Sequence, residues 1–216
     1  MAHAPRLPRR CSVGLVAALL ASFLVGTVAM PVPVPTAGAM RPTAPTETVY
    51  EGTGTQVLAI ELPDPAEVAV ATVTHSGESN FAIWELDEDL SQVALAVNTI
   101  GDYTGTVPLN LTADVTTTSL EITADGSWRI EVRPILDIRF FDTEVAGTGD
   151  DVVAYLGETQ VVSLAHEGDS NFAVWSHGEE SELVVNEIGA YNATVPLPGP
   201  AILVITANGP WSIHPT

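Results

Sequence analysis

Short apolar runs rich in Val, Ile and Thr recur about every 10 to 12 residues from position 48 onward, and turn-forming residues separate them. This region has no stretch with the 3.6-residue period of an amphipathic helix, and the runs have the length and composition of β-strands. The pattern predicts an all-β fold. In the first part of the chain, strands are expected at 56–61, 68–75, 80–86, 93–98, 104–109, 119–124 and 127–133.

The pattern also repeats. The tract HSGESNFAIW at 75–84 returns as HEGDSNFAVW at 166–175, and later blocks match at smaller offsets. The sequence distance between matching blocks of the two copies falls along the chain, which means that the second copy has lost residues between blocks. Such losses are tolerated in surface loops. Two copies of a run of short strands predict two tandem antiparallel β-sandwich domains, at 48–134 and 144–216. The lost residues predict loops near 62–67, 86–92 and 110–118.

Two dipeptides stand between apolar runs at matching places in the copies, Asp125-Gly126 and Asn208-Gly209. Such pairs favour type I′ hairpin turns, in which both central residues take positive φ. We expect a type I′ hairpin at each.

The repeated strand is apolar on both faces. Phe81 and Ile83 fall on one face by the two-residue period, while Ala82 and Trp84 fall on the other. This is typical of a central strand with one face in the sandwich core. Trp84 is then expected under a loop or at the contact between the domains.

The N-terminal segment has the features of an export signal. Arginines precede an uncharged apolar run at 13–30, and the small residues at 37–39 suit a cleavage site, so residues 1–39 are expected to be a signal peptide. The alternative is a retained anchor in the cytoplasmic membrane, because the run is nearly long enough to span a bilayer. Residues 40–47 are expected to form a Pro-rich spacer. The protein is thus predicted to be secreted or held at the cell surface.

Charge limits the partners. The formal net charge is −20, and all seven basic residues are arginine. Such a surface repels nucleic acid and anionic lipid, so no nucleic acid is expected as a partner, and it favours cations or cationic partners. The single cysteine, Cys11, lies before the apolar run, so the exported chain is expected to have no disulfide.

Residues 135–143 between the copies are too apolar for a flexible tether. We expect this connector to pack, as a strand, and to fix the relative pose of the domains. Arg129, Arg133 and Arg139 lie close together in sequence there. We hypothesise that they offset acidic repulsion at the junction.

The order of the repeated blocks resembles that of the small jelly-roll accessory domains of bacterial secreted proteins, of the pre-peptidase C-terminal type. The blocks are a Gly-Thr-Gly start, the Asn-Phe-Ala strand, an Ile-Gly-x-Tyr element and a final Asp/Asn-Gly-x-Trp hairpin. The Asp-Leu-Asp-Leu strand of that family is replaced here by Asn-Phe-Ala-Ile-Trp and Asn-Phe-Ala-Val-Trp. The resemblance implies that both sandwiches are jelly-roll-like and that the protein has a non-catalytic role in adhesion, substrate binding or spacing, and it assigns no site residue.

A catalytic site is not expected. The tract around Ser170, Gly-Asp-Ser-Asn, resembles the opening block of GDSL-type esterases. Such an enzyme needs its serine on a strand-to-helix turn and a base from a later Asp-x-x-His. Here the turn joins two strands, and His214 has no aspartate three residues before it. A secreted hydrolase is kept as an alternative.

Metal sites are also incomplete. His75 with Glu78, and His166 with Asp169, offer two ligands per turn where zinc takes three or four, so both histidines are expected to stabilise hairpins. No cofactor is expected, although clustered carboxylates make calcium possible. The calcium candidates are Asp87, Glu88, Asp89, Asp150, Asp151, Glu179, Glu180 and Glu182.

The four tryptophans form two repeat-related pairs and are the candidate ligand-binding residues. They are Trp84 with Trp175 and Trp128 with Trp211. Buried rings would fill the core or the domain contact, whereas exposed rings could stack on sugars. We expect an acidic, exported, non-catalytic binding or structural protein for an extracellular or cell-wall ligand. The alternative is a carbohydrate-binding protein with Trp and Tyr platforms, and the sequence predicts neither the ligand nor the oligomeric state.

Overall fold

The structure is a computed structural model that describes residues 47–216. The expected signal segment and the spacer up to residue 46 lie outside the described residues. The described chain is all β, as predicted, with 17 strands and one short 3₁₀ helix. No helix among the described residues is long and apolar enough to cross a membrane.

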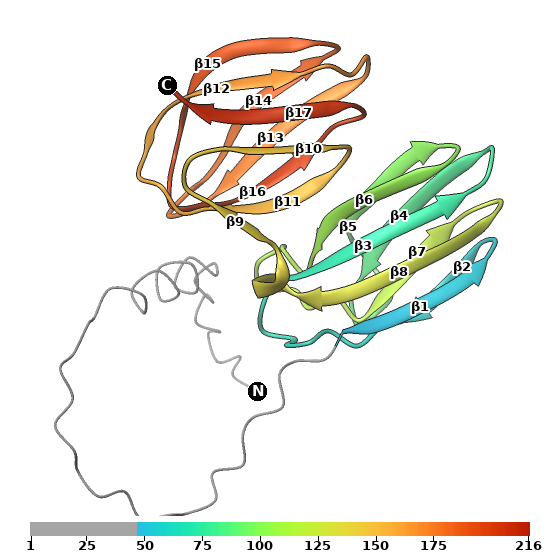
Figure 1. The fold of residues 1–216 in the computed structure, drawn as a ribbon. Coiled ribbons are helices and arrows are strands. Elements are labelled where there is room, and N and C mark those ends of the chain that lie inside the picture. Colours follow the sequence, from blue (N-terminus) through green and yellow to red (C-terminus); the bar gives the residue numbers. More distant parts are fainter. Residues whose placement is uncertain (1–46) are drawn as a thin grey trace, which may run out of the picture.

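The first eight strands lie within residues 48–134, which we call the N half. They are β1 (Thr48–Thr53), β2 (Gln56–Ala59), β3 (Ala69–Ser76), β4 (Asn80–Leu86), β5 (Gln92–Ile100), β6 (Tyr103–Leu109), β7 (Ser119–Thr123) and β8 (Ser127–Pro134). They form two antiparallel sheets, ordered β1-β8-β3-β6 and β2-β7-β4-β5 (Figure 1).

Residues 139–216, the C half, repeat this order. The strands are β9 (Arg139–Phe141), β10 (Val145–Thr148), β11 (Asp151–Tyr155), β12 (Gln160–His166), β13 (Asn171–His177), β14 (Ser181–Ile188), β15 (Tyr191–Leu197), β16 (Ala201–Thr206) and β17 (Pro210–Pro215). One sheet is ordered β10-β17-β12-β15 and the other β14-β13-β16-β11, with β9 added parallel to β11. The two halves appear as separate bundles of strands in Figure 1.

Each half buries its own apolar core between its two sheets. In the N half, Val73 and Ile130 of one sheet belong to the same buried cluster as Phe81 and Ile122 of the other. The C half has a corresponding cluster that includes Leu164 and Phe172. Alternation along the strands produces this arrangement, because every second side chain points to the same face.

The connector packs as expected. Its 3₁₀ helix, η1 (Ile135–Asp137), is followed by β9. Ile135 and Ile138 are buried in a third cluster with Val70 of the N half and Val152 of the C half. An apolar cluster with members from both halves therefore joins them.

The expected strands of the N half are confirmed to within two residues at each end, and the three expected loops lie between strands. Strand β1 was not predicted. Its side chains alternate between half-buried and exposed, without the apolar run that marks the other strands. It is placed by antiparallel pairing with β8, which is a long-range contact.

The type I′ turn prediction is wrong in both halves. The dipeptides Asp125-Gly126 and Asn208-Gly209 are absent from the described residues with positive φ. Instead, a Cβ on Gly126 would lie 1.7 Å from the carbonyl oxygen of Ser76, and one on Gly209 would lie 2.6 Å from the Cα of Gly168. Glycine is required at these positions because another backbone segment lies too close for a Cβ, and not because the residue takes a positive φ.

Candidate functional site

The halves meet in a polar contact beside the apolar cluster. The Tyr103 hydroxyl, at the start of β6, donates a 2.7 Å hydrogen bond to Oδ2 of Asp150. The Asp150 Oδ1 accepts the backbone N–H of Ala207 at 2.9 Å, and its carbonyl oxygen accepts the N–H of Thr106, also at 2.9 Å. Asp150 thus bonds both halves.

Burial changes the proton affinity of both side chains in this contact. Desolvation raises the pKa of the Asp150 carboxyl above its usual range, and the hydrogen bond from Tyr103 opposes the rise. Desolvation also raises the pKa of Tyr103, and the Asp150 charge adds to the effect. The tyrosine therefore stays protonated and donates the hydrogen bond.

A cavity of about 260 Å³ lies beside this contact. Strands β4, β5 and β6 and the following loop form its N-half wall, while β16 and Asp150 close it from the C half. Most of the wall is apolar, and it carries two carboxylates and no Lys, Arg or His. The wall includes Glu85, Leu95, Pro108, Leu111, Asp150 and Val204.

Glu85 is the most buried carboxylate at the cavity, with only 3% of the residue exposed. Its Oε2 accepts the backbone N–H of Asn110 at 2.7 Å and the hydroxyl of Thr117. Desolvation raises the pKa of Glu85, and these two hydrogen bonds oppose the rise. Both bonds end on Oε2, so Oε1 retains the capacity to accept a hydrogen bond from a bound group.

The loop at 110–118 holds Glu85 in place. Asn110 takes a positive φ of 61°, and its side chain donates to the carbonyl oxygens of Pro65 and Glu67 while accepting the N–H of Thr117. The loop is thereby fixed both to the β2–β3 connection and across its own ends. The C half has only residues 198–200 between the corresponding strands.

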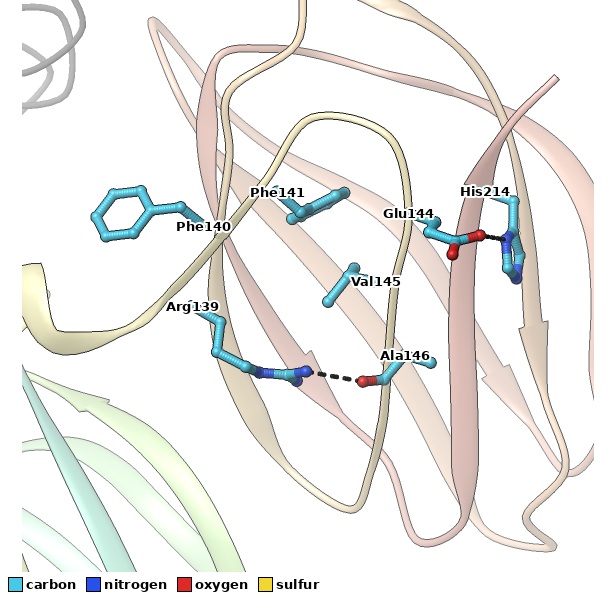
Figure 2. Close-up of a pocket in the computed structure, with 7 residues that line it drawn as sticks. All are labelled: Arg139, Phe140, Phe141, Glu144, Val145, Ala146 and His214. Atoms are coloured by element: carbon cyan, nitrogen blue, oxygen red, sulfur yellow. Dashed lines mark hydrogen bonds and ion pairs between the residues drawn. The ribbon is translucent and has the colours of Figure 1, made fainter. Parts of the chain in front are cut away.

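A second, more open groove of about 570 Å³ lies beside the connector in the C half, between β9 and β17. Figure 2 shows Arg139 directed toward Ala146 and Glu144 directed toward His214, while Phe140 points away from them. Arg139 donates to Asp151 at 2.6 Å and to the carbonyl oxygen of Ala146 at 2.9 Å.

The charged groups of this groove bind each other. Glu144 lies 3.3 Å from Nδ1 of His214, and the Arg139 guanidinium lies 5.9 Å from the ring centre of Trp211. A ligand in this groove would have to displace existing contacts. The cavity at Glu85 is therefore the stronger candidate site.

The structure separates the four candidate tryptophans. Trp128 and Trp211 are buried, and each donates its indole N–H to a backbone oxygen, of Gly54 and Gly149 respectively, at 3.0 Å. Trp175 is 40% exposed, with its ring 6.2 Å from that of His177.

Trp84 and Trp175, which are equivalent in the repeat, lie close to the cavity wall. Trp84 is half-buried and pairs across the sheet with Leu95. Trp175 pairs with Val204. Leu95 and Val204 both line the cavity.

Both repeat histidines are buried. Nδ1 of His75 lies 2.8 Å from the Gly101 carbonyl oxygen, and Nδ1 of His166 lies 2.9 Å from that of Gly189. Each ring stacks on the phenylalanine of the next strand, Phe81 or Phe172. These contacts fix the turns before β4 and β13. Ser170 lies in the second of these turns, and its N–H donates to Asn208.

The calcium candidates are dispersed. The Asp87 carboxylate accepts the N–H groups of Asp89 and Ser91 within its own turn, and Asp151 binds Arg139. Glu88, Glu179, Glu180 and Glu182 are exposed. Across residues 47–216, no group of three or more His, Cys, Asp or Glu is arranged to hold a metal ion.

The ion pairs of the three arginines lie within the halves rather than across the junction, so the hypothesis that they offset acidic repulsion there stays a prediction. Arg129 pairs with Glu131 at 2.6 Å, and Arg133 lies 3.7 Å from the same carboxylate, all on β8. Arg139 pairs within the C half, with Asp151. The direction of β8 places Arg129 away from the junction and Arg133 near it.

No protein-family model matches the chain, and no curated protein matches its sequence.

The sequence prediction missed Glu85 as a site residue. The two-residue period places Glu85 on the same strand face as Phe81 and Ile83, which is the core face, so a buried charge was detectable. The loop at 110–118 was predicted, but its bonding to Glu85 was not. Asp150 was named as a calcium candidate, and the structure places it at the contact between the halves.

Proposed function

We propose that the protein is an exported, non-catalytic binding protein built from two tandem jelly-roll domains, with its ligand site where the domains meet. The carrying observation is the cavity beside Glu85, which both halves enclose. Ligand sites occur preferentially at such junctions and combine apolar walls with a few polar groups. Localisation outside the cell or at its surface rests on the N-terminal sequence.

The strand order supports two domains. The order β1-β8-β3-β6 facing β2-β7-β4-β5 is that of an eight-stranded jelly roll, and β10 to β17 repeat it. Each half has a core of its own. A role without catalysis is in keeping with the bonding around Ser170, whose backbone N–H donates to Asn208 and whose carbonyl oxygen accepts from Gly189.

A carbohydrate-binding function is the second candidate, and the exposure of Trp175 favours it. A ring that is 40% exposed on a sheet face can stack on a sugar. Trp128 and Trp211 are too buried to contribute, so this function would depend on Trp175 and its neighbours.

Retention of the purified full-length protein on insoluble cell walls from the producing cells tests both functions. Thr112→Trp fills the cavity from an exposed loop position, and Thr194→Trp on β15 is the matched control. Loss of retention in the first variant alone supports the junction site. Loss in Trp175→Ala alone supports carbohydrate binding, and retention equal to wild type in both contradicts the two proposals.

A further inference from the structure

The two halves differ at the position of Glu85. The repeat alignment places Ser176 of β13 at this position, and both side chains are buried. The Ser176 hydroxyl donates to the carbonyl oxygen of Pro198 at 3.3 Å. The C half therefore folds with a small neutral residue where the N half buries a carboxylate. A carboxylate at this place is not a requirement of the fold.

The N half also carries the loop that hydrogen-bonds Glu85 and fixes its position. Both donors to Oε2, from Asn110 and Thr117, belong to the loop at 110–118, which the C half lacks. Burying a charge is costly unless hydrogen bonds and a counter-charge compensate. The loop supplies the hydrogen bonds, and no cationic side chain lines the cavity.

Residues 47–216 supply no counter-charge for Glu85, so a bound cation can provide it. All seven basic residues are arginine, and the three within residues 47–216 form ion pairs with carboxylates elsewhere. The net charge of −20 attracts cations toward the site over long range. The apolar wall favours a cation that carries an alkyl chain over a fully hydrated ion.

We propose that this cavity binds an alkylammonium group, with Oε1 of Glu85 accepting from the ammonium and Leu95, Pro108 and Val204 contacting the alkyl chain. The group belongs either to a small amine or to a lysine side chain of a partner. The volume of about 260 Å³ suits a group of this size, since it lies below the roughly 300–1,000 Å³ of drug-sized pockets. This inference rests on the proposed junction site and names the chemistry of its ligand.

Titration of the full-length protein with n-butylamine tests the proposal, with calorimetry and NMR as readouts. The neutral isostere n-butanol is the control ligand. We expect saturable binding of the amine, at least tenfold tighter than that of the alcohol, and shifts centred on Glu85 and Leu95. Equal binding of the two, or no binding of the amine, overturns the proposal.

Two variants test the role of the carboxylate. Glu85→Gln keeps the shape and the acceptor for Asn110 and Thr117, and is expected to weaken amine binding at least tenfold. Asp89→Asn removes one charge from an exposed turn and is expected to leave binding within twofold. Amine binding to Glu85→Gln at wild-type strength overturns the proposal. NMR spectra of both variants establish that they fold.

A second ligand distinguishes the two sources of the ammonium group. Tighter binding of Nα-acetyl-lysine methylamide than of n-butylamine assigns the site to a partner's lysine, and the reverse order assigns it to a free amine. Cavity-dependent retention on cell walls without amine binding would overturn this inference and leave the proposed function standing. If neither cavity-dependent retention nor amine binding is observed, both the proposed function and this inference are overturned.

Discussion

The N half and the C half share a strand order and a core, yet they differ around one tyrosine. Tyr103 and Tyr191 each pack against the phenylalanine of the repeated strand, with ring centres 5.9 and 5.8 Å apart. Tyr103 also donates to Asp150, while no described carboxylate accepts from the Tyr191 hydroxyl. The ring contact is therefore common to both halves as part of the fold, whereas the hydrogen bond to Asp150 joins the two halves.

The turns that precede β2 and β11 differ in the same way. Thr55 lies within 3.2 Å of the backbone nitrogen of Ala124, and Asp150 bonds the equivalent nitrogen, of Ala207, at 2.9 Å. Only Asp150 has a second oxygen to offer, which Tyr103 uses. Comparison of equivalent positions in the two halves thus distinguishes the residues that form each sandwich from those that join the halves and place a carboxylate at the site.

The largest expected effect is at Asp150. Asp150→Ala leaves the Tyr103 hydroxyl and the Ala207 N–H buried without partners, which should cost about 3 kcal/mol of unfolding free energy. Thr55→Ala removes two long, partly buried hydrogen bonds to Ala124, of 3.2 and 3.4 Å, and should cost about 1 kcal/mol. Urea denaturation of both variants measures the difference. Equal losses would mean that the Tyr103 bond contributes nothing to the junction.

Substitution of Glu85 should raise stability. Glu85→Gln removes a desolvated charge and keeps both donors satisfied, so the unfolding free energy at pH 8 should increase by about 1 kcal/mol. A stability gain together with a loss of amine binding is the signature of a residue kept for binding. Destabilisation by Glu85→Gln would instead assign the carboxylate a structural role.

The pH dependence of this gain follows from the raised pKa of Glu85. An acid with a raised folded-state pKa favours the folded state while protonated. That contribution is complete below the unfolded value of about 4.3 and is lost as pH rises through the folded-state pKa. The advantage of Glu85→Gln should therefore be absent in acid and grow with pH to a plateau. Thermal midpoints of both proteins across pH check this, with Asp89→Asn as the charge control.

Alternation and turn residues predicted most of the strands, because each strand carries its own apolar side chains. Strand β1 escaped prediction because pairing with β8, rather than local composition, makes it a strand. The Gly126 turn was assigned the wrong geometry, since close approach to Ser76 is a tertiary constraint.

The candidate site was harder to predict. Glu85 could be placed on the core face from the strand period. Its two donors come from a loop 25 and 32 residues further along the chain, and the cavity needs the other half to close it. No local pattern in the sequence encodes these contacts.

The smallest expected effect lies at the exposed turns beside the repeat histidines. Asp125 accepts the N–H groups of Glu78 and Ser79 and lies 3.5 Å from Nε2 of His75, whereas Asn208 occupies the equivalent place beside His166. The backbone hydrogen bond from Glu78 lowers the pKa of Asp125, and the bond from Ser79 and the charge of His75 lower it further.

A depressed carboxyl pKa gives stability that is present above the unfolded value of about 3.9 and is lost as pH falls through the folded-state pKa. Asp125→Asn should therefore flatten the acid limb of the thermal midpoint against pH. The reverse change, Asn208→Asp, should not restore a mirror-image gain, because Asn208 donates to Asp169 at 2.6 Å and an aspartate there would meet a like charge. If the two variants shift the acid limb equally in opposite directions, the two turns are electrostatically equivalent and this contrast between the halves is wrong.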